Sequence, residues 1–400
     1  MKYRAVPKTG DKISTIGFGC MRLATKLGRI DEKKAEEQIR YAVKQGINYF
    51  DTAYPYHNGE GERFLGKVFT DRSLRDKVKI ATKLPPWQIK KREDMDYILK
   101  DQLKKLQTQT IDYYLVHAVL NQEVWNRMKG LGILEFLDEA KEKGYIKNVG
   151  FSCHSDPKTF KNVIDDYGWD MCQIQYNFMD ENIQVGTEGL KYAAERNVAV
   201  FVMEPLRGGS LSNKVPKQVQ KLWDSTNVKR TPAEWALRWI WNHEEVTCIL
   251  SGMNEDNHIK ENINTANEAA LNSLTEKEVL LVEKVRDKYR ELTKVPCTSC
   301  GYCMPCPAGV NIPQCFEKYN DKYMFGGMNP RIMYEMHLGG LAGGKIARAS
   351  QCIKCGKCEK HCPQHIEIRK ELMNVSSEFD NITGKAINWV AKRAMDRRSK

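Results

Sequence analysis

The 400-residue sequence predicts an α/β fold, a (β/α)8 TIM barrel, followed by a second, smaller and mainly α-helical domain. Three observations lead to this prediction. Eight short apolar runs, rich in β-branched residues, alternate with helical patterns over roughly 250 residues, the usual size of such a barrel. The composition then changes near Thr293–Pro296. Most of the 13 cysteines follow that point, so the last part of the chain is expected to form a separate unit.

Each predicted strand is an almost continuous apolar run, as expected of a parallel sheet that is buried on both faces. The strands are expected at Ser14–Gly19, Tyr49–Ala53, Lys79–Leu84, Tyr113–Val119, Lys147–Ser152, Met171–Asn177, Ala199–Pro205 and Thr247–Met253. Residues 1–13 precede the first strand and are expected to form a small hairpin over the bottom of the barrel. A doubly wound open sheet is the alternative, but eight units would be long for it.

Helical patterns follow the strands and carry start and stop signals. The clearest helices are expected at Glu32–Gln45, Arg92–Gln107, Leu131–Lys143, Pro157–Tyr167, Gln184–Arg196 and Pro232–His243. Asp156 and Thr231 stand at N-cap positions, each with proline next, and Gly46 stands where the first helix stops. The domains are therefore expected at 1–292 for the barrel, 293–375 for the cysteine-rich domain and 376–400 for a basic tail.

The composition limits the class of protein. Hydrophobic residues make up 41% and charged residues 28% of the chain, which is the balance of a globular protein. No apolar run is long enough to span a membrane, and the start MKYRAVPKTG lacks the apolar stretch of a secretory signal, so we expect a cytoplasmic protein. The net charge of +12 usually serves solubility, and we expect no nucleic-acid partner. The oligomeric state is not predicted.

Two cysteine runs in the second domain share nearly the same spacing. The first is Cys297-x2-Cys300-x2-Cys303-x2-Cys306 and the second is Cys352-x2-Cys355-x2-Cys358-x3-Cys362, each followed by proline. The first three cysteines recur at a constant offset, which indicates a duplicated ligand motif. Two residues between ligands let one short loop fold around an iron–sulfur cube. In proteins with two such clusters, the cysteine before proline serves the other cube.

We therefore predict two 4Fe–4S clusters. Cys297, Cys300, Cys303 and Cys362 are expected to hold one cluster, and Cys352, Cys355, Cys358 and Cys306 the other. Structural zinc and disulfides are the alternatives. Structural zinc usually takes two separate CxxC pairs, and disulfides are rare in proteins that are not exported, so clusters are favoured. Cys315 lies outside both runs and is expected to be a packed thiol.

Four polar side chains fall at the carboxyl ends of three adjacent predicted strands, where barrels place their chemistry. Asp51 and Tyr56 follow the second strand, Lys83 lies at the end of the third, and His117 lies at the end of the fourth. An ammonium near a phenol lowers the pKa of the phenol, and a carboxylate holds that ammonium in place. A histidine can orient a carbonyl oxygen or relay its proton. These four residues, called the tetrad below, predict a proton donor at the barrel mouth.

The tetrad and its surroundings resemble a known family. The motifs GFGCMRL (17–23), DTAYPY (51–56), ATKL (81–84), LVH (115–117), GFS (150–152), EPLRGG (204–209) and SGMNEDNHIKEN (251–262) resemble those of the aldo-keto reductases. The whole chain looks like the bacterial and archaeal branch with a C-terminal dicluster ferredoxin domain. The resemblance implies an oxidoreductase that acts on a small carbonyl or alcohol. Tyr56 would be its general acid, Lys83 and Asp51 would tune that acid, and His117 would position the carbonyl.

The resemblance also implies a nicotinamide cofactor, NAD(P)H, across the barrel mouth. The matching positions are Ser152 and Gln173 for the carboxamide, Arg207, Gly208, Gly209, Ser251, Gly252 and Asn254 for the phosphates, and Glu261 and Asn262 near the adenine. Met203 replaces an aromatic residue that stacks on the nicotinamide, and Gly252 and His258 replace basic residues that grip an adenosine 2′-phosphate. The choice between NADH and NADPH therefore stays open.

A chain that joins hydride transfer to clusters raises a further expectation. Clusters pass single electrons and a hydride carries two, so a circuit between them needs a carrier that can do both, usually a flavin. FMN at the barrel mouth is therefore an alternative cofactor, and a ferredoxin or another redox protein is an expected partner. A redox-sensing regulatory subunit is the alternative from a different class of protein, and the intact tetrad counts against it.

Overall fold

In the computed structural model, the chain divides into two compact units. The structure describes residues 1–213, 215–268, 270–297, 301, 303–341, 344–362 and 364–381. The first unit comprises Met1–Leu211 and Arg230–Val279, and the second comprises Ser212–Lys229 and Leu280–Lys400. This division falls within α13 (Glu276–Glu291), earlier than the predicted boundary at residue 293. The predicted domain limits stay a prediction, and most of the predicted tail lies outside the described residues.

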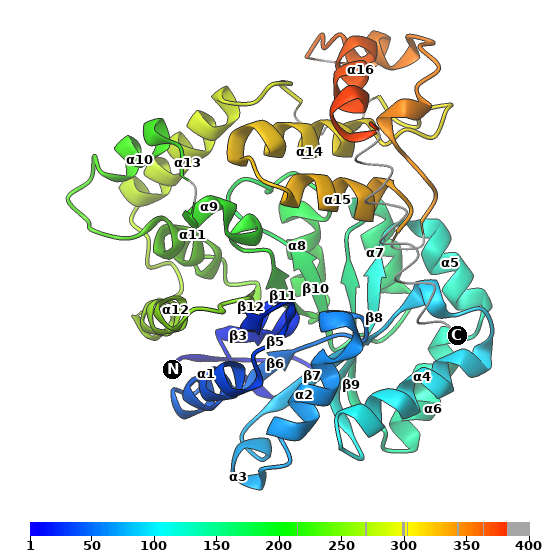
Figure 1. The fold of residues 1–400 in the computed structure, drawn as a ribbon, viewed down its shortest axis with the longest axis vertical. Coiled ribbons are helices and arrows are strands. Elements are labelled where there is room, and N and C mark those ends of the chain that lie inside the picture. Colours follow the sequence, from blue (N-terminus) through cyan, green and yellow to red (C-terminus); the bar gives the residue numbers. More distant parts are fainter. Residues whose placement is uncertain are drawn as a thin grey trace. The chain divides into compact units, whose positions relative to one another are not determined.

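Within the described ranges, eight strands close into a parallel barrel, which confirms the predicted fold class (Figure 1). They are β3 (Ile16–Gly19), β6 (Tyr49–Asp51), β7 (Lys79–Leu84), β8 (Ile111–Val119), β9 (Ile146–Cys153), β10 (Met171–Gln175), β11 (Ala199–Met203) and β12 (Val246–Ser251). Each strand pairs with the next along the chain, and β12 pairs with β3 to close the ring. Side chains on both faces are buried, which is why the runs read as continuously apolar.

Helices surround the barrel and begin at the predicted caps. They are α1 (Glu32–Lys44), α2 (Gly61–Val68), α3 (Arg72–Arg75), α4 (Arg92–Lys105), α5 (Gln122–Gly130), α6 (Ile133–Glu142), α7 (Pro157–Asp165), α8 (Gly186–Glu195), α9 (Ser210–Asn213), α11 (Pro232–Trp241) and α12 (Asp256–Glu268). The side chains of Asp156 and Thr231 each accept a hydrogen bond at 3.0 Å from a backbone N–H of the first turn. Gly132, with a φ of 79°, separates α6 from α5, a helix that the sequence did not predict.

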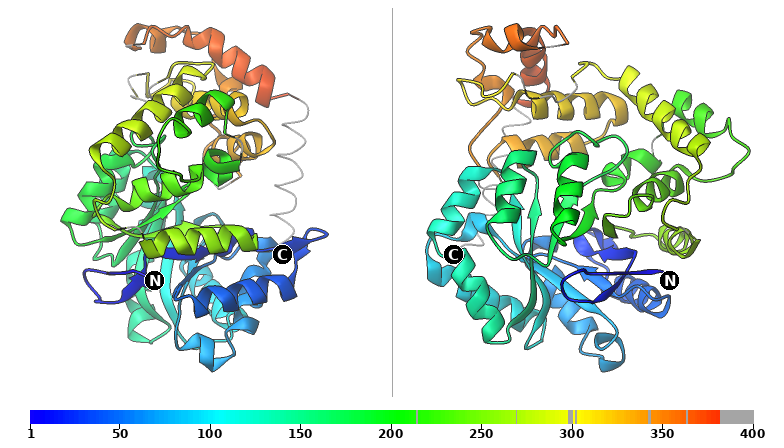
Figure 2. Two further views of the ribbon diagram at one scale, coloured as in Figure 1. Left: turned by 90° about the vertical axis from the view of Figure 1, so that its left-hand side faces the viewer. Right: turned by 180° about the vertical axis from the view of Figure 1, so that it is seen from behind.

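The amino end of the barrel is closed by the predicted hairpin. Its strands, β1 (Tyr3–Ala5) and β2 (Lys12–Ser14), pair antiparallel and appear in dark blue in Figure 2. Val6 and Ile13 are fully buried in one apolar cluster with residues of the barrel interior such as Phe201. A second hairpin, β4 (Thr25–Lys26) with β5 (Arg29–Ile30), follows the first barrel strand.

The second unit is mainly helical in its described part, as predicted. Its helices are α10 (Lys217–Trp223), α14 (Ile312–Phe325), α15 (Asn329–Leu338) and α16 (Ile368–Phe379), together with the later part of α13. α14 and α15 lie between the two cysteine runs in the sequence and share an apolar core with α16, in which the rings of Tyr334 and Phe379 stack at 4.6 Å. No helix in the described ranges of either unit is long and apolar enough to cross a membrane.

Candidate active site

The ends of β6 and β7 bring two opposite charges together inside the barrel. Lys83 Nζ donates hydrogen bonds to Asp51 Oδ1 at 2.6 Å and to the backbone oxygen of Thr52 at 2.8 Å. The other carboxylate oxygen accepts a hydrogen bond from Gln173 Nε2, on β10, at 2.5 Å. Asp51, Lys83 and Gln173 are all buried. A buried ion pair is tolerated when its remaining polar atoms are also bonded, and this pair meets that condition.

Tyr56 begins the short helix η2 (Tyr56–Gly59), and its ring centre lies 5.1 Å from Lys83 Nζ. Burial raises the pKa of the Tyr56 phenol above its usual value, and the nearby ammonium opposes this without outweighing it. The expectation of a lowered pKa is therefore wrong in its net direction, because it counted the ammonium and not the loss of water. Burial alone would lower the pKa of Lys83, but Asp51 and Tyr56 together raise it, so the ammonium is retained.

His117 reaches the site at an irregularity of β8. The pairing of β8 with β9 is interrupted beside it, where Ala118 has a φ of 51°. The imidazole lies edge-on to the Tyr56 ring, with 6.1 Å between centres, and 5.1 Å from the Trp87 ring. Burial, and then the charge of Lys83, lower the pKa of His117 well below its usual value, so the ring is neutral. Its buried Nδ1 has no hydrogen-bond partner among the described residues.

The two predicted carboxamide residues lie side by side. Ser152 on β9 and Gln173 on β10 are partners in the strand register, and both are buried. Ser152 Oγ accepts a hydrogen bond from the N–H of Ala118 at 2.7 Å, which ties the irregular end of β8 to β9. Met203 ends the neighbouring strand β11, opposite Gln175. The structure thus places these three predicted residues on three consecutive strands.

The loop after β11 contains the first predicted phosphate contacts. Arg207, Gly208 and Gly209 form the short helix η4, and the two glycines have φ values of 67° and 94°. Arg207 Nε pairs with Asp180 Oδ2 at 3.2 Å, and both side chains are buried. If this guanidinium turned toward a phosphate, the buried Asp180 carboxylate would lose this charge partner. Breaking a buried ion pair in this way costs roughly 3–5 kcal/mol of stability.

The loop after β12 contains the second set. Asn262 Nδ2 donates a hydrogen bond to Ser251 Oγ at 3.0 Å, and the backbone oxygen of Asn254 accepts one at 3.0 Å from a side chain of α1. The Glu261 carboxylate accepts a hydrogen bond from the Thr231 hydroxyl. Glu261 and Asn262, predicted to lie near an adenine, therefore also hold α12 and the loop in place.

Arg22 is a candidate that the sequence analysis missed. It ends the short helix η1 (Cys20–Arg22), and its Nη1 donates a hydrogen bond to the backbone oxygen of Gly208 at 2.8 Å. Its side-chain carbons stand 3.3–3.5 Å from the point where a Cβ on Gly252 would lie, so it spans both glycine loops. Arg22 is exposed, and no carboxylate pairs with it in the part of the chain that the structure describes. Its position in the GFGCMRL motif, shortly after a barrel strand, could have indicated a residue at the barrel mouth.

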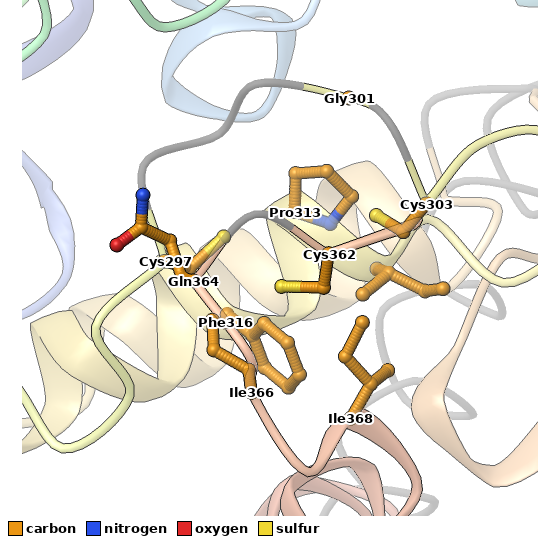
Figure 3. A pocket seen from close by; sticks show the side chains of 10 residues that line it. Cys297, Gly301, Cys303, Pro313, Phe316, Cys362, Gln364, Ile366 and Ile368 are labelled. Atoms are coloured by element: carbon orange, nitrogen blue, oxygen red, sulfur yellow. The ribbon is translucent and has the colours of Figure 1, made fainter. Parts of the chain in front are cut away.

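Three cysteines of the first predicted set line one pocket of the second unit (Figure 3). Cys297 and Cys303 come from the first run and Cys362 from the second, while Cys300 lies outside the described residues. The other lining residues are Gly301, Ile312, Pro313, Phe316, Gln364, Ile366 and Ile368. The pocket has about 320 Å³ of space, part of it open to solvent. Thiols from both runs within mainly apolar walls fit the crossed ligand set of an iron–sulfur cube.

Three residues of the second predicted set lie on the chain between η5 (Ala349–Gln351) and α16. Cys352, Cys355 and Cys358 belong to this segment. Cys306 begins a turn that ends at Gly309. A Cβ added to Gly309 would lie 4.0 Å from Gln351 Nε2, so this turn comes close to the end of η5. Among the described residues, no three His, Cys, Asp or Glu side chains are close enough to bind one metal ion. A cube distributes its ligands over several irons and so does not need that spacing. Cys315 is fully buried in the apolar core, as expected of a packed thiol.

Comparison with known proteins assigns both units to families. Residues 15–287 match the Aldo/keto reductase family, and residues 296–367 match the 4Fe-4S dicluster domain. Because the first match covers more than half of the chain, the protein belongs to the aldo/keto reductase family and is an oxidoreductase. More particularly, it is an enzyme of this family that carries a 4Fe–4S ferredoxin-like domain after its barrel.

Individual relatives match part of the chain. The chain is 30% identical over 232 residues to Aldo-keto reductase YhdN of Bacillus subtilis, covering 54% of this chain and 66% of that protein. It is 24% identical over 309 residues to Uncharacterized oxidoreductase YqkF of the same organism, covering 70% and 94%. Among solved structures, the holo form of aldo-keto reductase AKR11C1 from Bacillus halodurans matches with a TM-score of 0.61 and 27% identity, covering 71% of this chain and 96% of that one.

Proposed function

We propose that this enzyme reduces the carbonyl group of a small molecule, or oxidises the corresponding alcohol, at the barrel mouth. The observation that carries the proposal is the tetrad, in which the buried Lys83 ammonium is bonded to Asp51 at 2.6 Å and lies 5.1 Å from the Tyr56 ring centre. His117 adds a neutral imidazole whose Nδ1 has no partner among the described residues. Such a ring can hold a substrate oxygen by a hydrogen bond next to the phenol.

Tyr56 acts in this proposal as the proton donor. Because burial raises its pKa, the phenol keeps its proton at neutral pH. When negative charge develops on the substrate oxygen, the phenol transfers its proton to that oxygen. The phenolate left behind is stabilised by Lys83, which Asp51 holds in place. In the direction of alcohol oxidation, the same oxygen of Tyr56 takes the proton back.

We propose NAD(P)H as the resident cofactor, which supplies a hydride when it is bound. The adjacent side chains of Ser152 and Gln173 offer polar groups for a carboxamide. Arg22, exposed between the two glycine loops, offers the positive charge for the phosphates, while Arg207 supports its loop through Asp180. FMN in the same place is the alternative, and the replacement of basic residues by Gly252 and His258 favours it over NADPH.

We propose that the second unit holds two 4Fe–4S clusters, which supply one-electron storage and transfer. Cys297, Cys300, Cys303 and Cys362 would hold the first, and Cys352, Cys355, Cys358 and Cys306 the second. Cysteines of both runs around the pocket of Figure 3 support the crossed assignment. Clusters with thiolate ligands persist in a reducing compartment, so we place the enzyme in the cytoplasm, with a ferredoxin or similar redox protein as partner.

The test of this function compares Tyr56→Phe with Tyr54→Phe in anaerobically purified enzyme. Tyr56→Phe should lower carbonyl turnover by about 10²–10⁴-fold with nucleotide binding unchanged, since only the proton donor is lost. The control, Tyr54→Phe, removes a nearby hydroxyl from a ring that contacts Lys105 and not Lys83. This variant should retain turnover. Full turnover by Tyr56→Phe would favour the regulatory subunit. Flavin absorbance bands, without tight nucleotide binding, would favour FMN.

A further inference from the structure

The described cysteines of the second unit differ in their exposure to solvent. Cys297, Cys303 and Cys362 are half-buried around a pocket with apolar walls. In the second loop Cys355 is exposed, and the neighbouring Ile353 is 66% exposed. Electron transfer between proteins needs a cluster close to the surface at which the partner binds. The loop of the second predicted cluster is therefore the better point of contact.

The same loop carries an excess of positive charge. Lys354, Lys357 and Lys360 are all exposed, and none has an ion-pair partner in the part of the chain that the structure describes. The loop contains a single carboxylate, Glu359, and this is paired with the guanidinium of Arg369 at 2.7 Å. The three lysines therefore act together as a positive patch around Cys355, which we call the basic loop.

The basic loop is also fixed in shape. Lys354 and Gly356 have φ values of 57° and 73°, and the N–H of Lys354 points at Cys352 Sγ at 3.4 Å. The guanidinium of Arg369, on α16, stands 3.4 Å from the point where a Cβ on Gly356 would lie. A loop held in this way presents its lysines in one arrangement, which lowers the entropic cost of binding a partner.

At its start, the loop is anchored by a buried network. Arg348 bonds to Glu335 and, at 2.9 Å, to Asp380, while the same Asp380 accepts the N–H of Ser350 at 3.0 Å. Glu335 and Asp380 are largely buried in the second unit. The charged groups that position the loop are therefore bonded to one another, and the lysine charges of the basic loop are left for an external partner.

We propose that the basic loop, Ile353 with Lys354, Lys357 and Lys360 around Cys355, is the docking surface for an acidic one-electron carrier protein of the ferredoxin type. This inference rests on the clusters of the proposed function. Each reduced carrier would give up one electron to the second cluster, so that the carrier is oxidised by one electron and the bound cluster would be reduced by one. Opposite charges on the two surfaces accelerate the encounter and orient it.

The test is charge reversal of the basic loop, Lys354→Glu with Lys357→Glu and Lys360→Glu. The control, Lys33→Glu with Lys44→Glu and Lys104→Glu, changes the net charge equally at exposed lysines of the barrel helices. Stopped-flow spectroscopy measures cluster reduction by a reduced acidic ferredoxin and by dithionite, and titration calorimetry measures binding of the oxidised ferredoxin. At low salt the loop variant should be reduced by ferredoxin at least tenfold more slowly and bind it at least tenfold more weakly. Both differences should shrink at high salt.

Dithionite, which needs no docking surface, should reduce the wild type and both variants alike. Equal ferredoxin rates for wild type and loop variant, or equal slowing of the control, would overturn the inference while leaving the proposed function intact. An enzyme that contains no iron would overturn the cluster part of the proposed function and the docking surface with it. Unchanged iron content and carbonyl turnover in the loop variant would show that only docking is affected.

Discussion

The barrel mouth and the cysteine loops both carry chemistry, but they are stabilised in opposite ways. At the mouth, the ammonium of Lys83 is bonded to Asp51 and Thr52, and Gln173 satisfies the second carboxylate oxygen. These side chains stand on strands of a closed barrel. The described cysteines of the two runs stand on loops or, for Cys358, on the short helix η6 (Lys357–His361); most are half-buried, and three of them line a pocket.

The difference shows how each site obtains its geometry. The protein itself arranges the tetrad, so the barrel site is formed before any ligand binds. Thiols in loops have weak interactions of their own, and a bound metal centre supplies the missing stabilisation. The first site is therefore expected to respond to substitutions through its rate, and the second through its metal content and stability.

The sharpest test of the barrel side removes the ion pair as a whole, by Asp51→Asn with Lys83→Met, so that no lone charge stays buried. Reduction should slow by about 10²–10⁴-fold because the phenolate loses its counter-charge. In the wild type, the rate should be constant below the raised pKa of Tyr56 and fall above it, since the protonated phenol is required. Without Lys83 that pKa rises further, so the fall should move to higher pH. A pH–rate profile that does not move would contradict the pairing.

On the cluster side, Cys362→Ser should remove about half of the iron and sulfide per chain, because it takes one ligand from one of two cubes. Cys315→Ala is the matched control, since Cys315 is a fully buried thiol outside both runs. Metal analysis of the two variants measures the effect. Equal loss of iron in both, or loss of none in Cys362→Ser, would count against the crossed ligand set.

Iron chelation should separate the two units by stability. Removing the clusters should unfold residues after 295 while the barrel retains its helices, because only the second unit depends on metal. Hydrogen exchange on the chelated protein should rise in that part of the chain and stay low in β7 and β8. A single cooperative melting transition of the whole metal-free chain would break the contrast between the two regions.

The smallest expected effect belongs to Arg22→Gln. Loss of one phosphate contact should raise the Kd for NADH about tenfold, or about 1.4 kcal/mol, with turnover at saturation nearly unchanged. Arg29→Gln is the control, because Arg29 is an exposed arginine of the neighbouring hairpin. Fluorescence titration measures both. If Arg207→Gln weakened binding and Arg22→Gln did not, the roles assigned to the two arginines would be reversed.

Local signals allowed much of the fold to be predicted. The eight strands appeared as continuous apolar runs, and the caps at Asp156 and Thr231 marked two helices. Helix α5 was missed because its nine residues carry only three buried apolar side chains, too few to establish a helical period. Its stability comes from tertiary packing of Val124, Trp125 and Met128, which are buried. Such packing has no signature in a short window of sequence.

In the candidate site, too, features with a local sequence signal could be predicted, and features that depend on tertiary packing could not. The tetrad could be predicted because strand ends meet at one rim of a barrel, and the cysteine sets because ligand spacing is local; the roles of both stay predictions. The pairing of Arg207 with Asp180 was not found, since it joins loops after two different strands. The direction of the Tyr56 pKa shift was missed for a similar reason, because burial depends on the whole fold.

The hairpin at the amino end also has a consequence for ligand exchange. Val6 and Ile13 seal the floor of the barrel, so a molecule that reaches Tyr56 has to leave by the route it entered. Whatever sits deepest then departs last. A compulsory order of release would follow from a single entrance, without any moving gate.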